Sequence, residues 1–105
     1  MTSKLSTTID VVAPPIHPGE ILAEEIAVRG VSITSLARAL DVPTNRLTEI
    51  VAGRRSVTAD TALRLAAYLG TSARFWMNLQ ATYDLAVTRQ DHGDRIIQRV
   101  RPAAA

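Results

Sequence analysis

The sequence predicts an all-α protein, from its composition, the spacing of its apolar residues and its helix stop signals. The chain has 105 residues, which is about one domain with a single modest core. Hydrophobic residues make up 47% of it but aromatic residues only 4%, so the core must consist mainly of Leu, Ile, Val and Ala. Ala and Leu favour helices, and the β-branched or aromatic runs that favour strands are scarce.

An irregular arm, residues 1–16, is expected before the first helix. It is rich in Ser, Thr and Pro and has no helical period, although residues 9–12 favour a short extended segment. The first helix begins near Pro18, because proline suits a first turn, and the Glu20 carboxylate faces the positive end of the helix dipole. Gly30 is expected to end this helix.

The next two helices are separated by a very short break. Ser32 is a suitable N-cap for the first of them, residues 41–43 interrupt the helical pattern, and Gly53 closes the second. Their apolar residues recur at helical spacing: Ile33, Leu36, Ala37 and Leu40, then Leu47, Ile50 and Val51. Two short helices with a sharp turn between them are therefore expected.

Two further helices and a tail complete the prediction. Thr58 caps a fourth helix that stops at Gly70, and Ser72 starts a fifth that runs to about Gln90. A short sixth stretch is expected over Arg95–Val100, before a tail at residues 101–105. Residues 17–100 are thus predicted to form one domain, a compact bundle of short-linked helices.

The segment 32–55 has the spacing of a DNA-binding helix-turn-helix, in which the second helix enters the major groove. Ala37 is small where the two helices cross, and Asp41 tolerates the left-handed conformation that the turn needs. An ordinary helical hairpin would also be apolar at these offsets. The outer face of the second helix favours DNA binding, because its residues are short polar side chains and Arg.

Two sets of residues are candidates for DNA contact. Asn can pair with adenine and Arg with guanine, so we expect base contacts from Thr44, Asn45, Arg46 and Thr48. Thr44 and Asn45 could equally serve as helix caps. Hydroxyl groups at a helix N-terminus and nearby arginines suit phosphate, so phosphate contacts are expected from Ser32, Thr34, Ser35, Arg38, Arg54 and Arg55. The alternative for Arg54 and Arg55 is a solvated loop.

The fifth helix carries apolar residues on more than one face. A helix on a small bundle needs only one apolar stripe, so the surplus indicates either a homodimer interface or a fuller monomer core. The interface candidates are Phe75, Trp76, Leu79 and Tyr83. A dimer would place two recognition helices about 34 Å apart, one DNA turn, on an inverted repeat.

Enzyme, membrane and metal functions find little support. The chain has no Cys, its two histidines are far apart, and it lacks phosphate-cradling and hydrolase motifs, so no catalytic residue, cofactor or metal is expected. No apolar run approaches the roughly 18 residues that span a bilayer. The absence of Cys fits a reducing cytoplasm. A net charge of +2 is too small to indicate DNA by itself, but 11 of the 12 basic residues are Arg.

Three stretches of the chain resemble the HigA branch of the xenobiotic-response-element family of lambda-repressor-like proteins. They are HPGEILAEEIAVRG, SLARALDVPTNRLTEIVAGRRSVTADTALRLAAYLG and FWMNLQATYDLAV, and the resemblance covers about residues 17–88. The helix-turn-helix itself is common to many regulators. HPGE, TADTALRLA and FWMNLQATYDL are more specific.

The resemblance implies a lambda-repressor-like five-helix bundle with a helix-turn-helix and an extended C-terminal helix. It also implies a cytoplasmic antitoxin that neutralises a HigB-like mRNA-cleaving toxin and represses its own operon as a homodimer on double-stranded operator DNA. The contact residues above match the family's recognition helix, whereas no toxin-binding residue can be carried over. The alternatives are a stand-alone repressor without a toxin partner and a helix-turn-helix used only for protein contacts.

Overall fold

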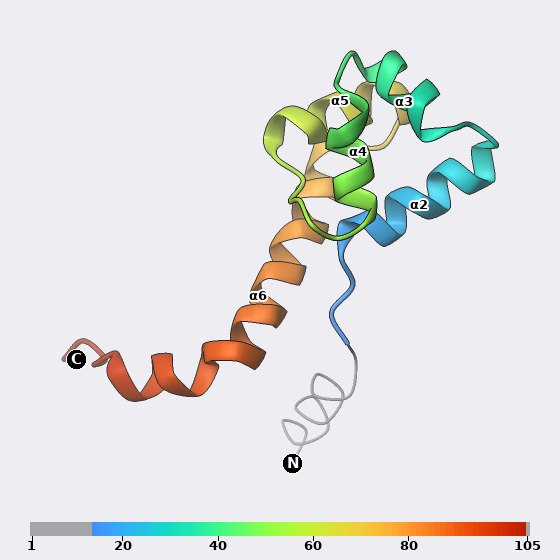
Figure 1. Ribbon diagram of the computed structural model, residues 1–105. Coiled ribbons are helices and arrows are strands. Elements are labelled where there is room, and N and C mark those ends of the chain that lie inside the picture. The colour runs from blue at the N-terminus through green and yellow to red at the C-terminus, as the bar shows by residue number, and fades with distance from the viewer. Residues whose placement is uncertain (1–13, 105) are drawn as a thin grey trace.

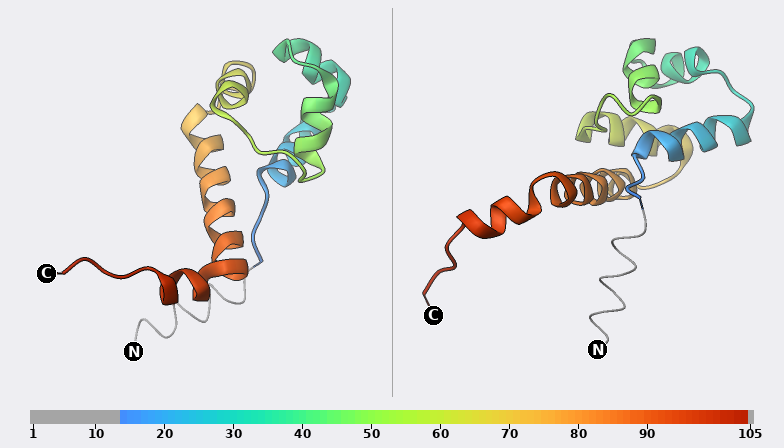
Figure 2. Two further views of the ribbon diagram at one scale, coloured as in Figure 1. Left: turned by 60° about the vertical axis from the view of Figure 1, so that its left-hand side comes forward. Right: turned by 60° about the horizontal axis from the view of Figure 1, so that its bottom comes forward.

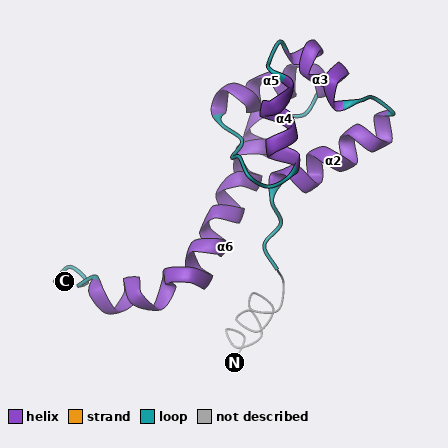
Figure 3. Ribbon diagram, in the orientation of Figure 1, coloured by secondary structure: helices purple, strands orange, loops and turns teal. Residues whose placement is uncertain are grey.

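The computed structural model describes residues 14–104, and this part of the chain contains five helices and no strand (Figure 1, Figure 3). The all-α prediction is confirmed. The helices are α2 Pro18–Arg29, α3 Ile33–Leu40, α4 Thr44–Val51, α5 Ala59–Leu69 and α6 Ala73–Arg99. The extended segment expected at residues 9–12 lies outside the described residues.

The helix ends follow the local signals in the sequence. The side chains of Ser32, Thr58 and Ser72 each accept a hydrogen bond from the backbone N–H three residues later, as N-caps do. Gly30 and Gly70 adopt the left-handed conformation after α2 and α5, with φ of 66° and 82°. These predicted boundaries are confirmed.

The start of α2 is more elaborate than a proline in the first turn. His17 is the N-cap: its Nδ1 accepts from the Gly19 N–H at 2.9 Å, while the Glu20 carboxylate accepts from the His17 N–H at 3.2 Å. The His17 ring also packs edge-on against Tyr83 of α6, with ring centroids 4.8 Å apart. This reciprocal cap fixes the beginning of α2 on α6.

The core lies among α2–α5 and the first half of α6, which gather into one end of the molecule (Figure 1). Its largest fully buried side chains are Trp76, Leu22, Leu36, Leu47, Ile50 and Leu65. Gln80 is a buried polar residue whose Oε1 accepts from the Val57 N–H at 2.7 Å, and this bond ties α6 to the segment before α5. The core therefore holds the helix pair α3 and α4 from behind.

Helices α2 and α4 approach each other closely at Gly19. A Cβ built on Gly19 would lie 1.9 Å from the Ile50 carbonyl oxygen, so no other residue fits this packing without a shift of backbone. Glycine is thus required at this position by space, since its φ is not positive.

Helix α6 is longer than predicted. The sequence predicted an end near Gln90 and a separate stretch over Arg95–Val100, and this was wrong: α6 is continuous to Arg99. Gly93 lies inside it, and one interior glycine costs only about 1 kcal/mol, which does not stop a helix. Figures 1 and 2 show the helix leaving the other four and bending in its last third. From residue 88 to 104 every residue is exposed except the half-buried Gly93.

Candidate nucleic-acid interface

Helices α3 and α4 form the predicted helix-turn-helix. Asp41 turns the chain with φ 59° and ψ 50°, and within residues 14–104 it is the one non-glycine residue with positive φ. The Val42 N–H then donates to the Ala37 carbonyl at 3.0 Å and completes the turn. Leu40 and Leu47 are buried on either side of it, so the angle between the helices is set by packing as well as by the turn.

The predicted base-contacting residues lie on α4, whose other side is fixed by buried Leu47 and Ile50. Successive residues of a helix are 100° apart, so Asn45 and Thr48 project away from these two core residues. Thr44, Asn45 and Thr48 are exposed, and the Thr48 hydroxyl donates to the Asn45 carbonyl at 3.2 Å. The N-cap of α4 is Pro43, which makes no side-chain cap bond, so Thr44 and Asn45 do not cap this helix.

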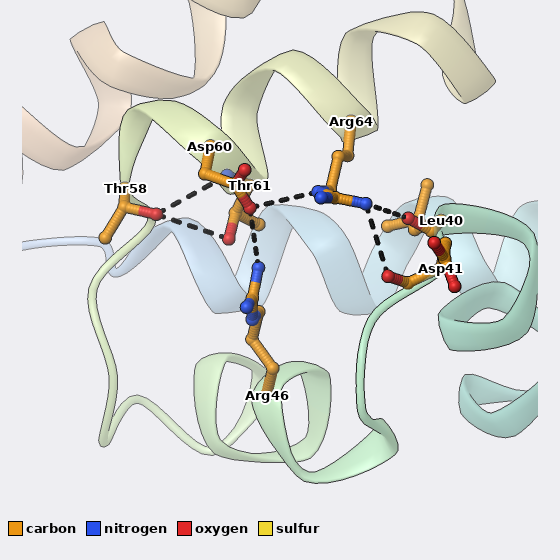
Figure 4. A network of polar contacts seen from close by, with 7 residues as sticks. All are labelled: Leu40, Asp41, Arg46, Thr58, Asp60, Thr61 and Arg64. Atoms are coloured by element: carbon orange, nitrogen blue, oxygen red, sulfur yellow. Dashed lines mark hydrogen bonds and ion pairs between the residues drawn. The ribbon is translucent and has the colours of Figure 1, made fainter.

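Arg46 is held at the side of α4 by α5. Its Nη1 donates to Asp60 Oδ2 at 2.7 Å, and Arg64 Nε donates to the same oxygen at 3.0 Å (Figure 4). Arg64 Nη1 in turn donates to the carbonyls of Leu40 and Asp41, at 2.8 and 3.2 Å. The hydrogen bonds from Arg64 and Arg46 lower the pKa of the Asp60 carboxyl below its usual value of 3.8.

The predicted phosphate contacts lie in two groups. Ser32, Thr34 and Ser35 are exposed around the first turn of α3, with the Ser32 hydroxyl engaged in capping. Arg38 and Arg54 are also exposed, and neither forms an ion pair with another residue of the described range 14–104. These groups leave hydroxyls and two cationic side chains open to solvent beside α4.

Arg55, the last of the predicted phosphate contacts, is already paired. Its guanidinium binds the Glu49 carboxylate, with Nη2 at 2.6 Å and Nε at 2.7 Å from Oε1. Glu49 lies on α4 four residues after Asn45, so an acidic side chain shares the outer face of that helix. Arg55 neutralises it there.

Sequence reasoning missed the three charged partners Glu49, Asp60 and Arg64. Glu49 and Arg55 lie close together in the sequence, and their spacing could have suggested a pair. Asp60 is 14 residues from Arg46, and the bond from Arg64 to Leu40 spans 24 residues. No local pattern identifies such pairs, because they depend on how α5 packs against the helix-turn-helix.

The interface candidates on α6 separate into two kinds. Trp76 is fully buried, and its Nε1 donates to the Thr71 hydroxyl at 2.8 Å, so its assignment to a surface between copies was wrong. Its position on the helix turns the indole into the core of the single chain. The Phe75 side chain is 41% exposed, while Leu79 and Tyr83 are half-buried.

A groove of about 750 Å³ runs beside these residues. Phe75, Leu79 and Ala86 of α6 line one side, and residues 14–16 with Ile21 line the other. Among residues 14–104, no cluster of His, Asp or Glu could hold a metal ion. In the same range no helix has the length and apolarity to cross a membrane.

Known proteins share both the sequence and this arrangement. The helix-turn-helix family matches residues 28–76. An addiction-module antidote protein of the HigA family from Coxiella burnetii is 50% identical, and its structure superposes with a TM-score of 0.82 over 87% of this chain and 100% of that chain. The chain belongs to the HigA family.

Two other relatives extend the comparison of this HigA-family protein. Virulence-associated protein I of Dichelobacter nodosus is 52% identical over 79 residues, which are 74% of this chain and 73% of that protein. The antitoxin HigA of Pseudomonas aeruginosa, solved with the higBA promoter, is 44% identical, with a TM-score of 0.81 over 86% of this chain and 99% of that chain. The lambda-repressor-like fold with an extended last helix is thus confirmed for this HigA-family chain.

Proposed function

We propose that this chain is the antitoxin of a toxin–antitoxin pair and represses its own operon by placing α4 in the major groove of operator DNA. The observation that carries the proposal is the exposed polar face of α4 in a HigA-family helix-turn-helix. Support comes from the P. aeruginosa relative, which was solved with a promoter. A protein that binds operator DNA acts in the bacterial cytoplasm.

The side chains have distinct roles in this proposal. Asn45 and Thr48 face the base edges directly, with Thr44 and Arg46 at the margins of the same face. Arg38 and Arg54 have cationic groups free for phosphates, and the first turn of α3 offers N–H and hydroxyl donors. Arg55 reaches a phosphate only by giving up Glu49.

Pairing of two copies through α6 would give the two-fold symmetry that an inverted repeat requires. Phe75, Leu79 and Tyr83 remain candidates for this contact, and Trp76 is no longer one. Support comes from the exposure of Phe75 and from the adjoining apolar groove. Burial of Phe75 by a second copy would remove an exposed aromatic side chain from water.

The toxin in this proposal is a HigB-like mRNA-cleaving protein that binds away from α4. Co-expression with the adjacent open reading frame tests this directly, by growth assay and co-purification. A neighbour that is toxic alone and forms a complex with this chain supports the antitoxin role. A harmless neighbour that does not co-purify overturns it and leaves the second candidate, a stand-alone repressor.

Operator binding is tested separately, with Asn45→Ala and the matched control Gln98→Ala at the exposed end of α6. A bidentate base contact is worth about 1–3 kcal/mol, so Asn45→Ala should weaken operator binding by about tenfold or more. Gln98→Ala should not change it. Toxin neutralisation should survive in Asn45→Ala, and equally in Arg46→Ala, because the toxin contact lies elsewhere. Loss of both activities in folded protein contradicts separate surfaces.

The salt dependence of binding distinguishes DNA contact from a protein-only module. A dimer that neutralises about 6–10 phosphates loses roughly 10³–10⁵ in affinity between 50 and 200 mM salt. A helix-turn-helix used only for protein contacts would bind no duplex at either concentration.

A further inference from the structure

A single carboxylate oxygen connects the recognition helix to the turn that orients it. Asp60 Oδ2 accepts from Arg46 Nη1 of α4 and from Arg64 Nε of α5, at 2.7 and 3.0 Å. Arg64 also donates to the carbonyls of Leu40 and Asp41 at the turn (Figure 4). Asp60 itself remains accessible, with 56% of its side chain exposed.

The Asp60 bond leaves one edge of the Arg46 guanidinium available. Nη1 is occupied, whereas the Nε and Nη2 donors form no hydrogen bond with other residues of the described range. Those two groups point the same way from the planar guanidinium and match a pair of acceptors, such as O6 and N7 of guanine. The Arg46 side chain is 29% exposed, so its free edge can be reached from solvent.

Phosphate and base edges compete differently for an arginine held in this way. A phosphate attracts a lone guanidinium from any sequence, since the attraction depends on charge alone. When a carboxylate is already bound, its negative charge repels the phosphate and offsets much of that attraction. A neutral base edge suffers little of this repulsion and can use the free Nε–Nη2 edge without displacing Asp60.

We propose that Asp60 is a specificity-determining residue for DNA recognition, which holds Arg46 for a base contact and suppresses its use as a general phosphate contact. The inference rests on the proposed function, because it requires α4 to enter the major groove. Asp60 is a positioning residue here, since it acts through Arg46. Its removal should therefore blur the difference between operator and unrelated DNA more than it weakens binding overall.

The test compares Asp60→Ala with Asp94→Ala, which removes the same charge from an exposed position on α6. The probes are the duplex that the wild-type protein selects from a random library and a scrambled duplex of equal length and composition. Asp60→Ala should bind the scrambled duplex more tightly, with a salt slope steeper by about one phosphate contact. Its ratio of selected to scrambled affinity should fall about tenfold.

Asp94→Ala should raise both affinities by a similar factor and keep the ratio. An Asp60→Ala ratio equal to that of Asp94→Ala overturns the proposal, because a general charge effect would then explain both variants. Circular dichroism melting of each variant confirms that the comparison is made on folded protein.

Two combined variants show whether Asp60 acts through Arg46. In an Arg46→Ala background, Asp60→Ala should no longer change the affinity ratio, since the side chain it controls is absent. A further fall in the ratio there refutes the assigned route and points to the Arg64 contacts at the turn. If the wild-type protein selects no duplex, the proposed function fails and this inference fails with it. Selection by wild type with an unchanged Asp60→Ala ratio refutes the inference alone.

Discussion

The contact between α2 and α4 at Gly19 predicts a large effect from the smallest possible side chain. Gly19→Ala places a Cβ 1.9 Å from the Ile50 carbonyl oxygen, whereas even close C–H···O contacts are about 3.3 Å. The two backbones must therefore separate by about 1.4 Å. Overpacking of a core costs about 1–3 kcal/mol, and the upper end applies because backbone, not a flexible side chain, must move. For a domain of this size, 3 kcal/mol lowers the melting temperature by roughly 12–24 °C.

The assay is thermal unfolding followed by circular dichroism, with Gly93→Ala as the matched control. A Cβ on Gly93 meets only the Arg89 Cβ, at 3.8 Å, an ordinary contact. Alanine is favoured over glycine in a helix interior by about 0.5–1 kcal/mol, so Gly93→Ala should melt slightly above wild type. Gly19→Ala should also weaken operator binding, because α4 is displaced. A Gly19→Ala melting temperature within a few degrees of wild type would refute the reasoning.

Three further predictions concern the core and the Asp60 network. Trp76→Ala should cost about 3–5 kcal/mol and largely unfold the chain, whereas Phe75→Ala at the exposed neighbour should keep the circular dichroism of wild type and weaken self-association in sedimentation; a folded Trp76→Ala contradicts this. Gln80→Met leaves the buried Val57 N–H without its acceptor, so the urea midpoint should fall by an amount equivalent to about 1–3 kcal/mol, and an unchanged midpoint counts against that bond. Because the pKa of Asp60 is lowered in the fold, its contribution to stability should be complete above the ordinary value of 3.8 and be lost as pH falls through the lower folded value. The difference in urea midpoint between wild type and Asp60→Ala should therefore be constant above about pH 5 and shrink below pH 4; a difference that persists unchanged at pH 2 contradicts the ion pairs.

The helix boundaries and the helix-turn-helix could be predicted because their causes are local. Ser32, Thr58 and Ser72 cap the helices that follow them, and this depends on a hydroxyl group three residues from an unpaired N–H. The turn at Asp41 likewise follows from the few residues that tolerate positive φ. Such features are determined within one or two turns of helix.

The remaining features depend on contacts between distant parts of the chain. Phe75 and Trp76 are adjacent aromatic residues, and the apolar pattern does not tell which of them faces the core. The pairing of Arg46 with Asp60 requires the position of α5, which no spacing within α4 reveals. Residues 91–94 have the polar and glycine composition of a break, yet α6 continues through them because the backbone ladder outweighs a modest local preference.

The buried indole of Trp76 also gives this protein an internal optical probe. It is the single tryptophan of the chain, is fully shielded from water and is hydrogen-bonded to Thr71, so its fluorescence reports the integrity of the core and shifts to the red when the chain unfolds. It lies on α6, away from the outer face of α4, so DNA should disturb its emission little. Since the sequence contains no cysteine, one introduced at an exposed site such as Thr48 would be the unique attachment point for a second dye. Folding and DNA engagement can then be followed at two separate wavelengths in one sample.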